Sequence, residues 1–177
     1  LGDYTNFSYI TPANSYPAGS VFQGISHDAS RDLALEINIR PQKNEKGNGY
    51  FNFNVGSKLI QISYAATGRI TVTGGGSAPV TPGEWYKVKV VMNSSGYKYY
   101  INGNLQQAIN YSWDFSSNVS LSYGLYLLEE GALKYDLKDI KLYYNDDNTV
   151  LNSFELDRNN TNIPQPQLFD YKVVQDE

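Results

Sequence analysis

Apolar and polar residues alternate with a period of two along most of this 177-residue chain. The segments 33–40 (LALEINIR), 50–55 (YFNFNV) and 58–64 (KLIQISY) each place an aliphatic or aromatic side chain at every second position. This pattern is typical of strands that turn one face to a hydrophobic core and the other to solvent. We therefore expect antiparallel strands with one buried face.

A hairpin is predicted between residues 83 and 107, GEWYKVKVVMNSSGYKYYINGNLQQ. Its second reversal is the pair Asn102-Gly103, two residue types that accept the positive φ angles of a tight turn. Trp85 precedes the first strand and has two interpretations, a core anchor or a platform for a ligand. Its place at the start of a strand favours the anchor.

Later segments show the strand pattern too, among them 118–128 (NVSLSYGLYLL), 135–144 (YDLKDIKLYY) and 150–156 (VLNSFEL). Gly, Asn, Ser and Tyr crowd every window that could form a helix, and these residues disfavour helix and favour strand and turn. So many short strands predict an all-β fold, either a sandwich or a barrel.

The composition suits one domain over residues 1–177, with its core in 20–145 and a closing strand or the start of a linker in 148–177. Hydrophobic residues make up 41% of the chain, enough to fill a core. The net charge of -4 and the lack of long basic runs exclude a nucleic-acid-binding surface. Without cysteine there is no disulfide or thiol catalysis, and no apolar run has the roughly 20 residues of a membrane span.

Three segments, GEWYKVKVV, YKYYINGN and DLKDIKLYY, resemble those of the laminin-G-like, concanavalin A-like jelly-roll superfamily. The resemblance covers roughly residues 20–145 and implies a sandwich of two antiparallel sheets, one of them concave. Ligands of such proteins commonly bind on the concave face or at the loop edges. The superfamily includes lectins, carbohydrate-binding modules, glycoside hydrolases, polysaccharide lyases and protein-binding modules, so the resemblance indicates fold more than activity.

Polar residues on the outward faces of the segments 33–40, 50–55 and 58–64 form the main candidate site. If these strands pair in sequence order, their outward side chains lie side by side in one groove. Amide groups offer donors and acceptors at fixed geometry, as sugar hydroxyls require. The expected groove residues are Glu36, Asn38, Arg40, Tyr50, Asn52, Asn54, Gln61 and Ser63.

Aromatic and basic residues add to this hypothesis. Tyr111 and Trp113 in the segment NYSWDF either form a stacking platform for a sugar ring or plug the edge of the sandwich. Tyr126 is a further outward-facing candidate. If Arg40 shares a groove with Lys87 and its neighbour Lys89, an anionic polysaccharide is favoured.

Catalysis is not expected from these residues. Glycoside hydrolysis ordinarily requires two carboxylates, and the segment 33–40 offers only Glu36. The resemblance to polysaccharide lyases implies a Gln-Ile-His strand, but Ser63 occupies the place of that histidine. His27 is the single histidine of the chain, and it precedes these segments in what we expect to be a loop.

Calcium is the one cofactor that we expect from the resemblance. Jelly rolls of this type frequently hold a structural Ca²⁺ near the first and last strands, and Asp3 with Asp139 is the candidate pair. Carboxylate oxygens are the ligands that Ca²⁺ prefers.

The sequence therefore predicts a non-catalytic carbohydrate-binding module that is part of a longer secreted or cell-surface bacterial protein. Such a module directs a covalently attached catalytic or surface domain to a polysaccharide or oligosaccharide. Two alternatives stay open, a protein-binding laminin-G-like module and a polysaccharide lyase. A contiguous exposed apolar patch would favour the first, and His27 beside Tyr50 or Arg40 would favour the second.

Overall fold

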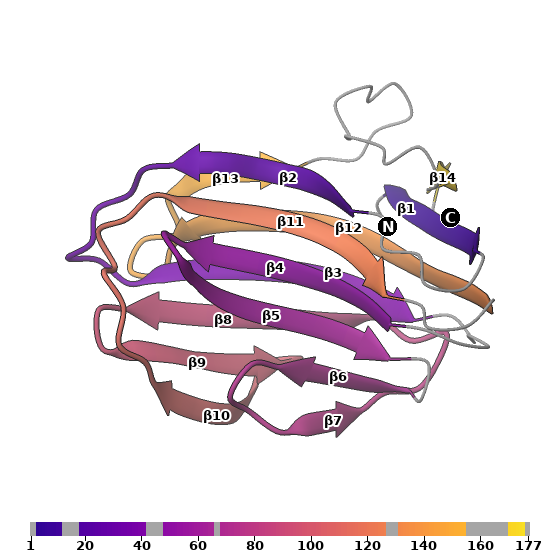
Figure 1. Cartoon of the computed structure of the whole chain (residues 1–177), viewed down its shortest axis with the longest axis horizontal. Helices are drawn as coiled ribbons and strands as arrows, with labels where there is room; N and C mark the ends of the chain where they lie inside the picture. Colours follow the sequence, from indigo (N-terminus) through magenta and orange to yellow (C-terminus); the bar gives the residue numbers. More distant parts are fainter. Residues whose placement is uncertain are drawn as a thin grey trace.

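The computed structural model describes residues 3–11, 18–41, 48–65, 68–126, 131–154 and 170–175, with side chains over 20–41, 48–65, 68–124 and 136–153. Two antiparallel sheets pack face to face and form a β-sandwich (Figure 1). The described residues contain no helix, so none of them forms an apolar helix that could cross a membrane. The predicted all-β sandwich is confirmed.

The larger sheet has eight strands, seven of them in one continuous order with the eighth, β13, beside β12. The order is β10 (Asn104–Asn110), β9 (Gly96–Ile101), β8 (Tyr86–Asn93), β3 (Leu33–Pro41), β12 (Gly131–Tyr144), β1 (Asp3–Thr11) and β14 (Asp170–Gln175), and β13 is Val150–Phe154.

The smaller sheet has six strands and lies in front of the larger one in Figure 1. Its order is β2 (Ala18–Ile25), β11 (Val119–Tyr126), β4 (Asn48–Val55), β5 (Lys58–Ala65), β6 (Arg69–Val72) and β7 (Ser77–Pro79).

Alternate residues of both sheets meet in one hydrophobic core. Leu35 and Val88 from the larger sheet and Phe53 and Ile60 from the smaller one are at most 1% exposed. Burying side chains of this size contributes roughly 1.5–3 kcal/mol each to folding. The period-two pattern is therefore explained by the packing of one sheet against the other.

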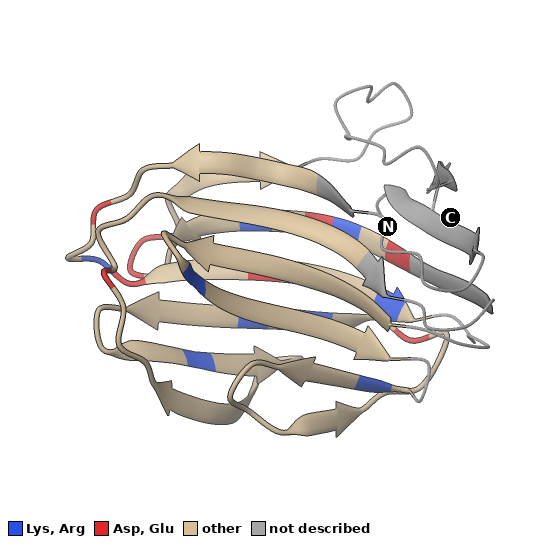
Figure 2. Cartoon of the chain, in the orientation of Figure 1, with Lys and Arg blue, Asp and Glu red and all other residues tan. Residues whose placement is uncertain are grey.

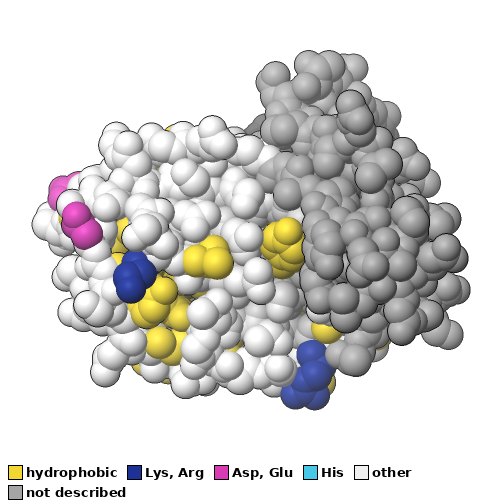
Figure 3. Space-filling view, in the orientation of Figure 1, with side chains coloured by type: hydrophobic (Ala, Val, Ile, Leu, Met, Phe, Trp, Pro, Cys, Tyr) yellow, Lys and Arg dark blue, Asp and Glu magenta, His cyan; other side chains and the backbone are white. Residues whose placement is uncertain are grey.

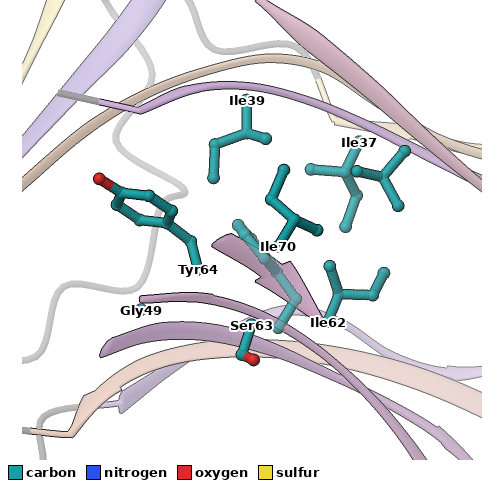
Figure 4. Close-up of a pocket in the computed structure, with 9 residues that line it drawn as sticks. Ile37, Ile39, Gly49, Ile62, Ser63, Tyr64 and Ile70 are labelled. Atoms are coloured by element: carbon teal, nitrogen blue, oxygen red, sulfur yellow. The ribbon is translucent and has the colours of Figure 1, made fainter. Parts of the chain in front are cut away.

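A gap of about 10 Å³ between the sheets interrupts this packing. Ile37, Ile39, Ile62 and Ile70 surround it, and the hydroxyl group of Ser63 points away from it (Figure 4). Most of the lining is apolar, and Tyr64 is the residue that adds a hydroxyl-bearing ring beside the isoleucines. The gap has room for about one water molecule, so it is too small for a sugar.

The predicted pairing of the three segments in sequence order is wrong in one place. β4 pairs with β5 as expected, but β3 pairs with β8 and β12 in the other sheet. The pattern could not distinguish these arrangements, because strands that face each other across a core alternate in the same way as strands that pair.

The hairpin turn at Asn102-Gly103 is confirmed. Both residues have positive φ angles, 52° and 82°. The Asn102 side chain also ties the turn to β8, because its Oδ1 accepts a hydrogen bond from the backbone N–H of Lys87 at 2.8 Å. Turn chemistry that is local in sequence was therefore sufficient to place this reversal.

A chain of aromatic rings closes one end of the sandwich. Trp113 lies 5.1 Å from Tyr111, 5.4 Å from Phe115 and 6.0 Å from Tyr97, measured between ring centroids. Its Nε1–H donates a hydrogen bond to the carbonyl oxygen of Asn93 at 2.8 Å. Tyr111 and Trp113 pack against the core, so the plug is the interpretation that the structure supports.

Two glycine substitutions should have very different effects on stability. A Cβ atom added at Gly103 would meet open space, so Gly103→Ala should cost about 1 kcal/mol from its positive φ alone. At Gly96, with φ of 145°, a Cβ atom would overlap the carbonyl oxygen of Ile109, so Gly96→Ala should cost about 3 kcal/mol or more. Urea unfolding of both variants measures this difference, and equal losses would contradict it.

Removing the plug should destabilise the domain. Trp113→Ala leaves a cavity at the end of the core and should cost about 3 kcal/mol of unfolding free energy. Trp113→Phe keeps most of the ring and should lose about 1 kcal/mol with the hydrogen bond to Asn93. Chemical denaturation compares the two variants; an unchanged midpoint for Trp113→Ala would show that the ring does not close the core.

Candidate functional site

The outer face of the six-stranded sheet consists mostly of uncharged polar residues, with the exposed Leu59 opposite Asn54, and we call it the neutral face. Because side chains alternate along a strand, every residue between two core positions of β4, β5, β6 and β11 points to this surface. Its members are Tyr50, Asn52, Asn54, Gln61, Ser63, Thr71, Ser120 and Ser122.

These side chains form rows across the strands. Asn52 lies between Ser122 of β11 and Gln61 of β5. The Nε2 of Gln61 donates a hydrogen bond to the Oδ1 of Asn52 at 2.9 Å. This bond fixes the direction of both amides and leaves further donor and acceptor positions of each amide for other partners.

Tyr50 occupies the next row, where its neighbour across the strands is Gly124. The Tyr50 ring lies so close to Gly124 that a Cβ atom there would overlap it. The ring is half-buried, and this burial raises the pKa of the Tyr50 phenol. The hydroxyl group therefore stays protonated at neutral pH and can donate a hydrogen bond.

Charge is confined to the margins of this face. Among its described side chains only Lys58, at the start of β5, and Arg69, at the start of β6, are charged. Figure 3 shows the same distribution, with basic side chains at two edges of this surface and acidic ones only at one end. Surfaces designed for solubility carry about 25–35% charged residues, and the middle of this face carries none among its described side chains.

The outer face of the eight-stranded sheet is different, and we call it the basic face. Its described basic residues come from four neighbouring strands (Figure 2). They are Arg40 of β3, Lys87 and Lys89 of β8, Lys98 of β9, and Lys138 and Lys141 of β12.

An ion pair and an aromatic ring hold one end of the basic face. The Nε of Arg40 lies 2.7 Å from the Oδ2 of Asp136, whose side chain is 1% exposed. The guanidinium group of Arg40 and the ammonium group of Lys138 lie 4.8 Å and 4.2 Å from the centre of the Trp85 ring. Such contacts between cations and aromatic rings are attractive.

A tyrosine and a glutamate interact near the middle of this face. The hydroxyl group of Tyr143 donates a hydrogen bond to the Oε1 of Glu36 at 2.6 Å, and the Nζ of Lys89 lies 5.4 Å from the centre of the Tyr143 ring. Burial first, and then the bond and the charge of Glu36, raise the pKa of Tyr143 well above its usual range. Glu36 therefore accepts a hydrogen bond from a phenol that stays protonated at neutral pH.

The predicted common groove is wrong, because the core separates its two halves. β3 belongs to one sheet and β4 and β5 to the other. The neutral face has Tyr50, Asn52, Asn54, Gln61 and Ser63, whereas the basic face has Glu36, Asn38, Arg40 and Lys87.

Other predicted residues have separate positions. Trp85 is partly exposed on the basic face and not part of the buried core, so its interpretation as a core anchor is wrong. Tyr111 and Trp113 belong to the plug, and the Tyr111 hydroxyl group lies 3.4 Å from the carbonyl oxygen of Leu59, the residue opposite Asn54. The side chain of Tyr126 in β11 lies outside the described residues.

His27 does not approach the residues that a lyase would require. Its ring lies 4.8 Å from that of Phe115, and its Nε2 is 3.2 Å from the carbonyl oxygen of Ser117. It therefore belongs to the plugged end of the sandwich and not to a cleft with Tyr50 or Arg40.

The calcium hypothesis concerns Asp3 and Asp139. Asp3 begins β1, and its side chain lies outside the described residues. Asp139 lies in β12 at an irregularity of the strand. Within the described part of the chain, no three His, Asp or Glu side chains come together as metal ligands would.

Sequence reasoning missed several residues of both faces. Ser120 and Ser122 join the neutral face, and Lys138 and Lys141 join the basic face. The alternation in NVSLSYGLYLL could have found Ser120 and Ser122. Strict alternation in YDLKDIKLYY would place Lys138 and Lys141 on opposite faces, and only the bulge at Asp139 brings both to the basic face.

Several solved structures share this fold. A sialidase superposes with a TM-score of 0.62 at 14% identity, covering 81% of this chain and 15% of the sialidase. An endo-β-1,4-glucuronan lyase from the fungus Trichoderma reesei gives 0.57 at 11% identity, covering 84% of this chain and 83% of the lyase. The Emp46p carbohydrate recognition domain in its potassium-bound form gives a TM-score of 0.55 at 11% identity. The match covers 79% of this chain and 88% of that domain.

At these identities the likeness shows the fold and not the activity. The chain spans less than a sixth of the sialidase that it resembles. No curated protein matches the sequence. The family model of the concanavalin A-like lectin/glucanases superfamily, however, matches residues 23–127, more than half of the chain. The chain belongs to the concanavalin A-like lectin/glucanase superfamily.

Proposed function

We propose that this domain is a polysaccharide-binding module whose neutral face binds an uncharged stretch of sugar chain. The observation that carries the proposal is the grid of amides and hydroxyls on β4, β5, β6 and β11, with charges only at its margins. The superfamily of the chain includes lectins, and a carbohydrate recognition domain is among the structures with this fold.

The chemistry of the neutral face matches that of sugar hydroxyls. Each hydroxyl group donates and accepts, and the side chains of Asn52, Asn54 and Gln61 offer both functions. The half-buried Tyr50 adds a ring whose apolar surface can pack on the CH groups of a pyranose. Neutral partners avoid the cost of removing charged groups from water, which would otherwise oppose binding.

The geometry suits an extended ligand. Neighbouring strands lie about 4.8 Å apart, so the rows across β11, β4 and β5 present polar groups at regular intervals. Because the sheet is formed before the ligand arrives, little conformational entropy is lost on its side of the interface.

Binding of this kind supports a targeting function. We propose that the module is part of a secreted or cell-surface protein and raises the local concentration of an attached domain at its polysaccharide. Weak binding by the module is sufficient for this. Once the module is bound, the attached domain is held near the polymer, and its own encounter with the polymer becomes intramolecular.

The alternative functions find less support in the geometry. A protein-binding module should expose a contiguous apolar patch, but the large exposed apolar side chains of the described residues are Leu59, Leu105 and Val150, on three different strands. A lyase needs a proton acceptor at its site, and His27 lies at the plugged end.

Replacing three amides should abolish binding to neutral polysaccharides. Asn52→Ala, Asn54→Ala and Gln61→Ala together remove the central donors and acceptors, so we expect at least a tenfold weaker retardation in affinity gels containing β-glucan, galactan or dextran. Asn104→Ala with Gln106→Ala, which removes exposed amides of β10, is the matched control and should bind like the parent protein.

Urea unfolding checks that the triple variant is folded, since these surface changes should alter its stability by no more than about 1 kcal/mol. Parent protein that is not retarded by any neutral polymer, or a triple variant retarded like its parent, would reject the proposal.

A further inference from the structure

The basic face contains a hollow that arises from a bulge in β12. Between Lys138 and Lys141, β12 advances three residues while β3 advances two, from Asn38 to Glu36. Asp139, the residue in the bulge, has a φ angle of 51° and its carbonyl oxygen accepts a hydrogen bond from the Asn38 amide at 3.3 Å. Bulges of this kind redirect side chains and are frequent beside functional sites.

The hollow has a volume of about 390 Å³, within the range of small-molecule sites. It crosses four neighbouring strands, β8, β3, β12 and β13. Its polar lining consists of Glu36, Asn38, Lys87, Asp139, Lys141 and Ser153. A ligand in it would therefore meet both positively charged donors and oxygen acceptors.

Lys87 and Lys141 supply the positive charge. They stand on β8 and β12, with β3 between them, so about 10 Å of sheet separates their strands. Neither forms an ion pair with another described residue. Both ammonium groups are therefore available to an external anion.

Glu36 and Asp139 give the hollow its acceptors. Glu36 keeps its orientation through the Tyr143 hydroxyl group, which engages Oε1. A carboxylate accepts several hydrogen bonds, so Glu36 can also receive one from a sugar hydroxyl. Alternating lysines and carboxylates thus match a ligand that carries hydroxyl groups together with a negative charge.

The whole basic face favours an anion over a neutral ligand. Its described side chains include six Lys and Arg residues, in a chain that has 14 and a net charge of -4. The described acidic residues on it are Glu36, Asp136 and Asp139, and the carboxylate of Asp136 is already paired with Arg40. Clustered charge of one sign raises the local concentration of oppositely charged ligands.

We propose that this hollow is a second binding site, which takes a carboxylate-bearing sugar unit of an acidic polysaccharide. Lys87 and Lys141 bind the carboxylate, and Glu36 and Asp139 accept hydrogen bonds from its hydroxyl groups. The site lies on the opposite side of the sandwich from the neutral face, and it is independent of the function proposed for that face.

Charge-removing substitutions on the two faces test this site. Lys87→Gln with Lys141→Gln should weaken binding to polygalacturonate about tenfold in affinity gels and by calorimetry. The matched control, Lys58→Gln with Arg69→Gln, removes the same charge from the other face and should leave polygalacturonate binding within about twofold of the parent. Dextran retardation should not change in either variant.

Raising NaCl from 50 to 300 mM should weaken polygalacturonate binding by the parent and have much less effect on the lysine variant, since salt screens charges. Equal losses of polygalacturonate binding in both charge variants would overturn the proposal. The attraction would then depend on the net charge of the protein and not on this hollow. Binding to dextran sulfate without binding to polygalacturonate would overturn it as well. The triple amide variant should still bind polygalacturonate, which separates this test from that of the neutral face.

Discussion

The packing of two sheets through one hydrophobic core determines every other feature of this domain. Since strand side chains alternate, each residue buried between the sheets commits its neighbours to an outer surface. The core uses nearly all large aliphatic side chains of the described strands, and of the described residues three large apolar ones are exposed. The two outer sheet faces that this packing leaves differ sharply in charge.

The alternation of residues predicts the elements of this fold but not their pairing. It gave the strands, their buried sides and the sandwich, and the local chemistry of Asn102-Gly103 gave the turn. It could not assign β3 and β4 to different sheets, because that depends on which strands meet across the core. The bulge at Asp139 also escaped prediction, since an extra residue in a strand has no distinct sequence signal here.

The aromatic residues show how the same side chain suits two interpretations. Trp113 was as plausible a ligand platform as a plug, and only its packing against Tyr111 and Phe115 decides between them. Trp85 is the opposite case. Its ring is expected in the core, but it lies on a surface and contacts the cationic groups of Arg40 and Lys138. The sequence gives the number of aromatic residues, but only their tertiary contacts show which of them lie in the core and which on the surface.

The thickness of the sandwich has a consequence for how such a domain can change over time. Stacked sheets lie about 10 Å apart, so side chains on the two outer faces share no contacts, and the energetic effects of their substitutions should simply add. Natural variation can therefore revise one surface without disturbing the other. A lineage could replace the side chains of one face and inherit those of the opposite face intact.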